Sequence, residues 1–77
     1  MWIIEFKNKT GDYQRIKDDW FEDAEPEYCS DTPMKPRPLD VCIARYNFYS
    51  HYGHFFKKAG WRFRNVDTDV ILPAELI

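Results

Sequence analysis

The stretch that most constrains the fold is residues 39–64, in the second half of the chain. Its apolar residues recur about every 3.6 positions, which is typical of an amphipathic helix. Pro38 and Asp40 suit the start of a helix, and Gly60 suits the residue just beyond its end. We therefore expect a helix of about 18 residues, about 27 Å long, that leads directly into a strand.

The period of the helix predicts which of its sides faces the core. One stripe of apolar helical residues is expected to meet one face of each flanking strand. Arg45 lies within this stripe, so we expect its stem to pack on the core and its guanidinium to pair with an acid of residues 18–31. The alternative is an arginine at an interface. The predicted core is Trp2, Ile4, Phe6, Val41, Phe48, Tyr52, Phe55, Trp61 and Phe63.

Strand-like patterns lie before and after the helix. Residues 1–7 and 61–66 alternate along the chain, and the shorter segments 12–17 and 70–72 can return beside them. The order strand, strand, helix, strand, strand predicts an α+β fold. In this fold one long amphipathic helix packs across a small antiparallel sheet.

The chain is short enough to form one domain, residues 1–77, with an acidic and proline-rich loop at about 18–38. Residues 18–24 within this loop are expected to form a short helical turn. Asp19 would cap this turn, and Glu22 would be the second member of a capping box.

Charge is unevenly distributed, although the net charge is only −2. Residues 1–31 hold nine acids and four bases, residues 32–64 hold seven bases and one acid, and residues 65–77 hold three acids and no base. Either the oppositely charged parts face each other in the fold or in a dimer, or they form separate patches for different partners.

Sequence signals for export and for membranes are missing. Residues 1–5 lack a signal-peptide pattern, and no apolar run approaches the roughly 20 residues that span a membrane. The two cysteines, Cys29 and Cys42, are fewer than a secreted domain of this size usually carries. We therefore expect a cytoplasmic protein without membrane contact, with both thiols reduced and buried.

No pattern indicates catalysis or a bound metal. The sequence has no glycine-rich phosphate loop, HExxH or GxSxG motif, and a domain this small rarely encloses a water-excluding cleft. Zinc is disfavoured because Cys29 and Cys42 are separated by twelve residues, and Cys42 points away from His51 and His54 on the helix. We expect no enzyme activity, no metal and no cofactor.

Residues 18–31 contain seven acids, three aromatic residues and no base. Aromatic anchors among carboxylates suit a basic groove on another protein, where the carboxylates would take the places of phosphates. The first hypothesis is a non-catalytic inhibitor or modulator that occludes a basic, nucleic-acid-binding surface of a partner, such as a nucleic-acid-processing complex. The expected partner-binding residues are Trp20, Phe21, Glu22, Asp23, Glu25 and Tyr28.

Two alternatives remain open. One is a small single-stranded nucleic-acid-binding protein that uses basic residues interleaved with aromatic ones, although the pI near 5.6 is low for a dedicated binder. The other is a homodimeric accessory subunit, because 14 aromatic residues are more than so small a core can bury. The nucleic-acid alternative would use Lys57, Lys58, Arg62 and Arg64.

The small size, the many aromatic residues, the separated charges and the lack of catalytic motifs form a recognisable combination. In general type it resembles small phage proteins that inhibit host defence or nucleic-acid machinery. This resemblance implies a phage–host interaction with an anti-defence role and a host protein as the partner.

Overall fold

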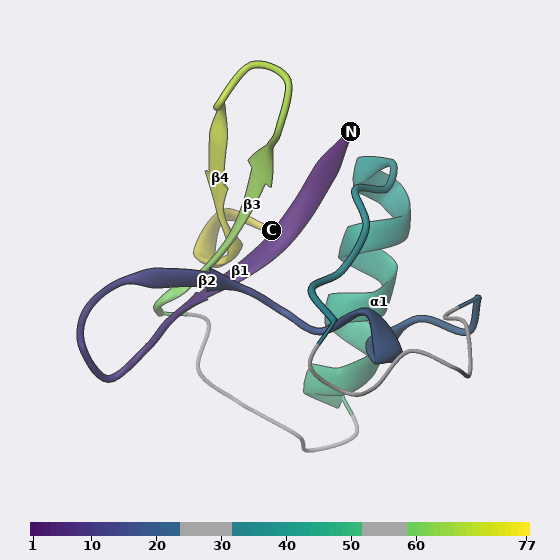
Figure 1. Cartoon of the computed structure of the whole chain (residues 1–77), viewed down its shortest axis with the longest axis horizontal. Coiled ribbons are helices and arrows are strands. Elements are labelled where there is room, and N and C mark those ends of the chain that lie inside the picture. The colour runs from purple at the N-terminus through teal and green to yellow at the C-terminus, as the bar shows by residue number, and fades with distance from the viewer. Residues whose placement is uncertain (24–31, 52–58) are drawn as a thin grey trace.

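A four-stranded antiparallel sheet and one α-helix form the domain in the computed structural model, which describes residues 1–23, 32–51 and 59–77 (Figure 1). The strand order is β2-β1-β3-β4, and the helix packs on β1. The predicted α+β fold is therefore confirmed. The elements are β1 (Trp2–Lys7), β2 (Tyr13–Arg15), α1 (Leu39–His51), β3 (Trp61–Asn65), β4 (Ile71–Pro73) and two 3-10 helices, η1 (Asp18–Trp20) and η2 (Ala74–Leu76).

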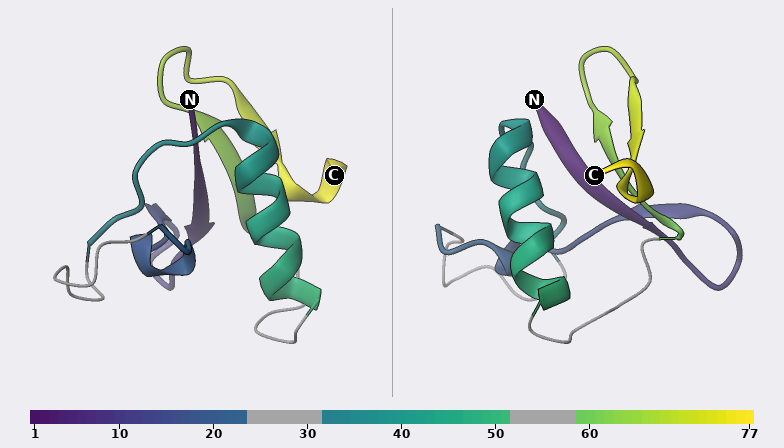
Figure 2. Two further views of the ribbon diagram at one scale, coloured as in Figure 1. Left: turned by 90° about the vertical axis from the view of Figure 1, so that its right-hand side faces the viewer. Right: turned by 180° about the vertical axis from the view of Figure 1, so that it is seen from behind.

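Strand β1 is the centre of the fold. It pairs with β3 from Trp2–Asn65 to Phe6–Trp61 and with β2 from Glu5–Arg15 to Lys7–Tyr13. These pairings put alternate side chains of β1 on opposite faces of the sheet. Figure 2 shows α1 on one side of this sheet.

The second half of the proline-rich loop pairs with Ile16, just after β2, and with Trp2 at the start of β1. The backbone N–H of Met34 donates to the carbonyl of Ile16 at 2.8 Å, and Trp2 and Arg37 exchange two backbone hydrogen bonds of 2.7 and 2.9 Å. Prolines cannot donate such bonds, so the non-proline residues between them supply the contacts. The loop is thus fixed beside the start of β1.

The helix packs on the sheet with a different side from the one predicted. Cys42 and Tyr46 are buried, whereas Val41 and Phe48 are 40% and 46% exposed. The inner side is turned by about a third of a turn from the predicted stripe. The reason is the connection to β1: because Arg37 pairs with Trp2 just before α1 begins, the Cys42 thiol comes to lie 3.5 Å from the Trp2 carbonyl.

The predicted core is confirmed in part, and the observed core also contains residues that the sequence pattern did not indicate. Trp2, Phe6 and Trp61 are partly buried against it, while Tyr52 and Phe55 lie outside the described residues. The fully or almost fully buried apolar residues are Ile3, Ile4, Ile16, Phe21, Met34, Cys42, Tyr46, Phe63 and Ala74.

Local details of the predicted elements also differ. The residue that caps η1 is Lys17, without a side-chain hydrogen bond, so the predicted cap at Asp19 is wrong. Gly60 has the expected positive φ, +84°, and its carbonyl accepts a hydrogen bond from the backbone N–H of Lys7 at 2.8 Å. The predicted continuation of the helix through residues 52–58 lies outside the described residues. Among the helices that are described, none has the length and apolar character needed to cross a membrane.

Candidate protein-binding surface

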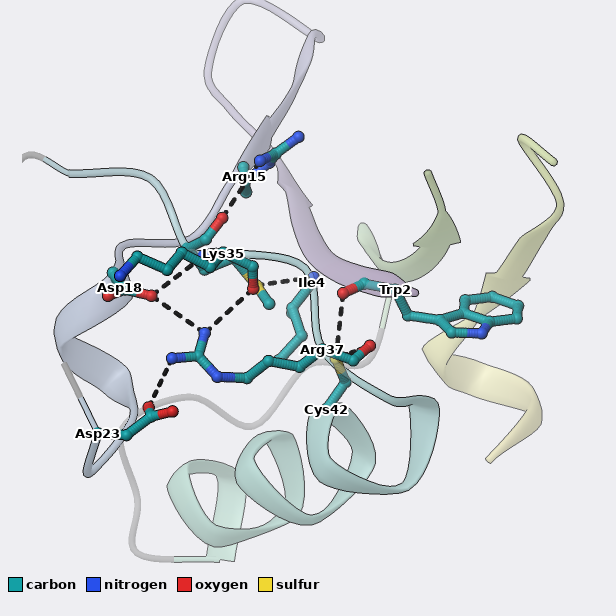
Figure 3. A network of polar contacts seen from close by, with 9 residues as sticks. Trp2, Ile4, Arg15, Asp18, Asp23, Lys35, Arg37 and Cys42 are labelled. Carbon is teal, nitrogen blue, oxygen red and sulfur yellow. Dashed lines mark hydrogen bonds and ion pairs between the residues drawn. The ribbon is translucent and has the colours of Figure 1, made fainter. Parts of the chain in front are cut away.

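The acidic segment begins with a carboxylate that is buried rather than exposed. Asp18 is 2% exposed, and its Oδ1 accepts hydrogen bonds from the backbone N–H of Lys35 and from Nη1 of Arg37, both at 3.0 Å (Figure 3). Nη1 of Arg37 also donates to the Lys35 carbonyl at 3.0 Å. Asp18 therefore joins η1 to the proline-rich loop.

Arg37 extends this network to the end of the described acidic segment. Its Nη2 donates to Oδ1 of Asp23 at 2.6 Å, and its guanidinium carbon lies 3.8 Å from the centre of the Phe21 ring. Two carboxylates thus accept hydrogen bonds from the guanidinium, and the Phe21 ring stacks against it. Both kinds of contact suit the planar, delocalised charge of an arginine. Arg37 fixes the path of residues 18–23.

The same contacts set the protonation of Asp18. Burial alone raises the pKa of a carboxyl group, but the hydrogen bonds from the Lys35 backbone and the Arg37 side chain, with the charge of Arg37, lower the pKa of Asp18 below its ordinary value. Asp18 is therefore ionised at neutral pH. Its Oδ2 has no hydrogen-bond partner among the described residues.

Two of the expected partner-binding residues face into the domain. Phe21 is 5% exposed and belongs to the core. The ring centre of Trp20, which is half-buried, lies 4.4 Å from that of Tyr49 and 5.9 Å from that of Trp61. These rings anchor the acidic segment to α1 and β3.

The other expected partner-binding residues divide into exposed and undescribed ones. The side chains of Glu22 and Asp23 are 89% and 74% exposed. Glu25 and Tyr28 lie outside the described residues. The acidic segment therefore offers carboxylates at the surface beside its buried rings.

The exposed side of α1 lies beside Glu22. Val41, Ala44 and Phe48 are exposed on this side, and together with Glu22 and Arg45 they line a hollow of about 330 Å³. These five residues are called the helix–loop surface below. Apolar residues that the helical period predicted for the core thus form the floor of an open site.

Arg45 forms the link between the helix and the acidic segment. Its Nη2 lies 3.6 Å from Oε1 of Glu22, and its guanidinium carbon lies 5.2 Å from the centre of the Phe48 ring. The predicted pairing of Arg45 with an acid of residues 18–31 is confirmed. With Arg37, which pairs with Asp18 and Asp23, it also shows that part of the basic stretch faces the acidic one.

The predicted nucleic-acid-binding residues are only partly described. Arg62 and Arg64 lie on β3 and are half-buried, and each donates from Nε to Oε1 of Glu5, at 2.9 and 3.2 Å. Lys57 and Lys58 lie outside the described residues. The two arginines project from the sheet face opposite α1, so they are not part of the helix–loop surface.

Of the four residues considered as zinc ligands, the structure describes Cys42 and His51. Cys42 is a free, buried thiol whose pKa burial raises to about 11, so it is protonated at neutral pH. His51 is exposed, and Cys29 and His54 lie outside the described residues. Within the described ranges, no group of three His, Cys, Asp or Glu residues is placed to hold a metal ion.

Comparison with protein-family models, curated proteins and solved structures gives no match to this chain. Its function is therefore inferred from its own residues.

Two features of the site were missed from the sequence. The role of Arg37 had one available signal, a single arginine between two prolines shortly after a run of acids. No sequence signal indicated that Val41 and Phe48 would be exposed. Helix α1 carries apolar side chains on several sides, so the positions of its apolar residues did not identify the side that packs on the sheet.

Proposed function

We propose that this domain is a non-catalytic protein-binding module that inhibits or modulates its partner through the helix–loop surface. The partner presents an apolar side chain flanked by lysines or arginines. Binding covers that basic surface and keeps nucleic acid from it, which is inhibition by occlusion.

The exposed apolar side of α1 is the observation that carries this proposal. Phe48 and Val41 are large, exposed apolar residues on one side of one helix, and they border a hollow that can receive a side chain. Aromatic residues in such places are common centres of protein interfaces. Their position next to Glu22 joins an apolar anchor site to the acidic segment.

Charge favours a basic partner. Exposed acids flank the residues of this surface in the sequence: Asp19 and Asp23 lie on either side of Glu22, and Asp40 precedes Val41. Two of these carboxylates already have one basic partner inside the domain, Glu22 in Arg45 and Asp23 in Arg37. A lysine or arginine of the partner can pair with these carboxylates around the apolar contact, which strengthens orientation and speeds association.

The chemistry of the hollow favours binding over catalysis. Its two charged groups, Glu22 and Arg45, contact each other, and its other lining residues are apolar. This arrangement supports a surface that recognises a partner without reacting with it.

The test is affinity capture from lysate of the source organism, after nuclease treatment, with matched variants as bait. Phe48→Ala and Glu22→Lys change the helix–loop surface. Leu76→Ala and Glu75→Lys make the same kinds of change on η2, where both residues are exposed. We expect one protein to be retained in a fixed ratio by the native domain and by both η2 variants, and at least tenfold less by Phe48→Ala and Glu22→Lys.

Three outcomes would contradict the proposal. They are capture that is equal for all four variants, capture that disappears with nuclease, and a stable homodimer that is disrupted by Phe48→Ala in light scattering. The last result would assign the same surface to a second copy of the chain.

A further inference from the structure

The face of the sheet opposite α1 carries a cluster of charged side chains and one tyrosine. Strand pairing places Glu5 and Lys7 of β1, Tyr13 and Arg15 of β2, and Arg62 and Arg64 of β3 on this face. The ring contacts of Tyr46 with Phe63 and Trp61 put α1 on the other one. These six residues are called the far sheet face.

Arg62 is held in place from two directions. Its Nε donates to Glu5, and its guanidinium carbon lies 3.6 Å from the centre of the Tyr13 ring. Its terminal amino groups, Nη1 and Nη2, have no partner among the described residues, while the side chain is 21% exposed. Arg62 therefore presents a fixed pair of donors, and the far side of its guanidinium plane is not covered by Tyr13.

The far sheet face has a surplus of positive charge. Glu5 is almost buried and is shared by Arg62 and Arg64, so one carboxylate faces two guanidinium groups. Arg15 donates from Nη1 to a neutral acceptor, the Met34 carbonyl, at 3.2 Å. Lys7 is exposed. Asp69 at the rim pairs with Arg64 at 3.1 Å, which leaves more cations than anions on this face.

We propose that the far sheet face binds single-stranded nucleic acid. The terminal amino groups of Arg62 take one phosphate in a two-pronged contact, and Lys7 and Arg15 take neighbouring phosphates. A base stacks on the exposed part of the Arg62 guanidinium, which continues the stack that begins with Tyr13. This stacking platform favours nucleic acid over an acidic peptide, because a peptide would use the charges but not the plane.

This surface is separate from the helix–loop surface. The two lie on opposite sides of the sheet, so a strand of nucleic acid and a protein partner can be bound together. Failure of either proposal leaves the other standing.

Fluorescence anisotropy with a labelled single-stranded oligonucleotide of about 12 nucleotides, over a series of salt concentrations, tests this inference. With three phosphates contacted, a plot of the logarithm of the affinity against the logarithm of the salt concentration should have a slope of about −2. We expect Arg62→Gln to weaken binding at least tenfold and Lys7→Gln at least threefold. Within the described residues the Lys7 side chain makes no hydrogen bond or ion pair, and its backbone pairing does not depend on the side chain, so the Lys7→Gln variant stays informative even if Arg62→Gln unfolds.

The control is Arg45→Gln, which removes the same charge from the other side of the sheet and should change the affinity less than twofold. Polyglutamate should not displace the oligonucleotide at equal charge concentration. The inference is overturned by absent binding, by a slope near zero, by equal losses in Arg45→Gln and Lys7→Gln, or by displacement with polyglutamate.

Discussion

At the scale of single residues, the ion pair between Arg37 and Asp18 has the greatest structural consequence. Both side chains are buried, and Arg37 also reaches Asp23 and the Phe21 ring. A buried ion pair adds little net stability over apolar residues of the same shape, but loss of one partner leaves an uncompensated charge. The pair therefore specifies the path of the acidic segment more than it stabilises the fold.

Replacement of Arg37 alone should be costly for this reason. We expect Arg37→Met to lower the free energy of unfolding by about 3–5 kcal/mol, measured by urea denaturation with tryptophan fluorescence. In the double variant Asp18→Asn/Arg37→Met the buried charge is gone, and a substantial part of the loss should be recovered. If single and double variants were equally unstable, the two side chains would not be coupled.

Asp18 also predicts how stability depends on acid. Its pKa is lower in the folded state than the ordinary value of 3.8, so its stabilising contribution is complete above that value and is lost as the pH falls through the folded pKa. We expect the loss of stability below about pH 4 to be clearly shallower in Asp18→Asn, in urea titrations across pH 2–6. The exposed control Glu75→Gln should keep the native profile. An unchanged slope in Asp18→Asn would contradict this assignment.

At the scale of elements, α1 has two apolar sides with different tasks. The ring of Tyr46 packs edge-on against Phe63 at 5.5 Å between ring centres, whereas Phe48 points outward beside Arg45. One helix thus supplies the core with one side and the helix–loop surface with the other.

A matched pair of truncations separates these tasks. We expect Tyr46→Ala to lower the free energy of unfolding by about 3–5 kcal/mol, because the ring is 1% exposed in the core. Phe48→Ala should cost about 1 kcal/mol or less, because Phe48 is 46% exposed in the folded domain. Chemical denaturation measures both, and a greater cost at Phe48 than at Tyr46 would show that the helix packs with its other side.

The sequence predicted the elements better than their packing. The helix start, all four strands and the positive φ of Gly60 follow from local period and turn chemistry, which neighbouring residues determine. The rotation of α1 depends on the Trp2–Arg37 bridge, a contact between distant parts of the chain. The same limit applies to the candidate site: the acids at 22 and 23 were recognised, but the inward turn of Phe21 depends on Arg37.

At the scale of the whole molecule, the two-layer architecture gives the domain two distinct outer faces. The outer side of α1, with the acidic segment, is apolar and acidic, and the far sheet face is basic. The pairs of Arg37 and Arg45 with the acidic segment neutralise part of the charge contrast inside the fold. Exposed acids such as Glu22 lie beside the outer side of α1, and exposed bases such as Lys7 lie on the far sheet face. A basic partner and an acidic partner would therefore meet opposite sides of the domain.

We expect the protein partner to meet the outer side of α1, and covalent carbene footprinting of the native domain tests this expectation. The domain is labelled alone and with the captured protein, and the modified residues are located by mass spectrometry. We predict that labelling of Val41 and Phe48 falls at least fivefold in the complex, while that of Leu76, an exposed apolar residue on η2, is unchanged. Unchanged labelling of Val41 and Phe48, with protection of Leu76 or Tyr13 instead, would contradict this expectation.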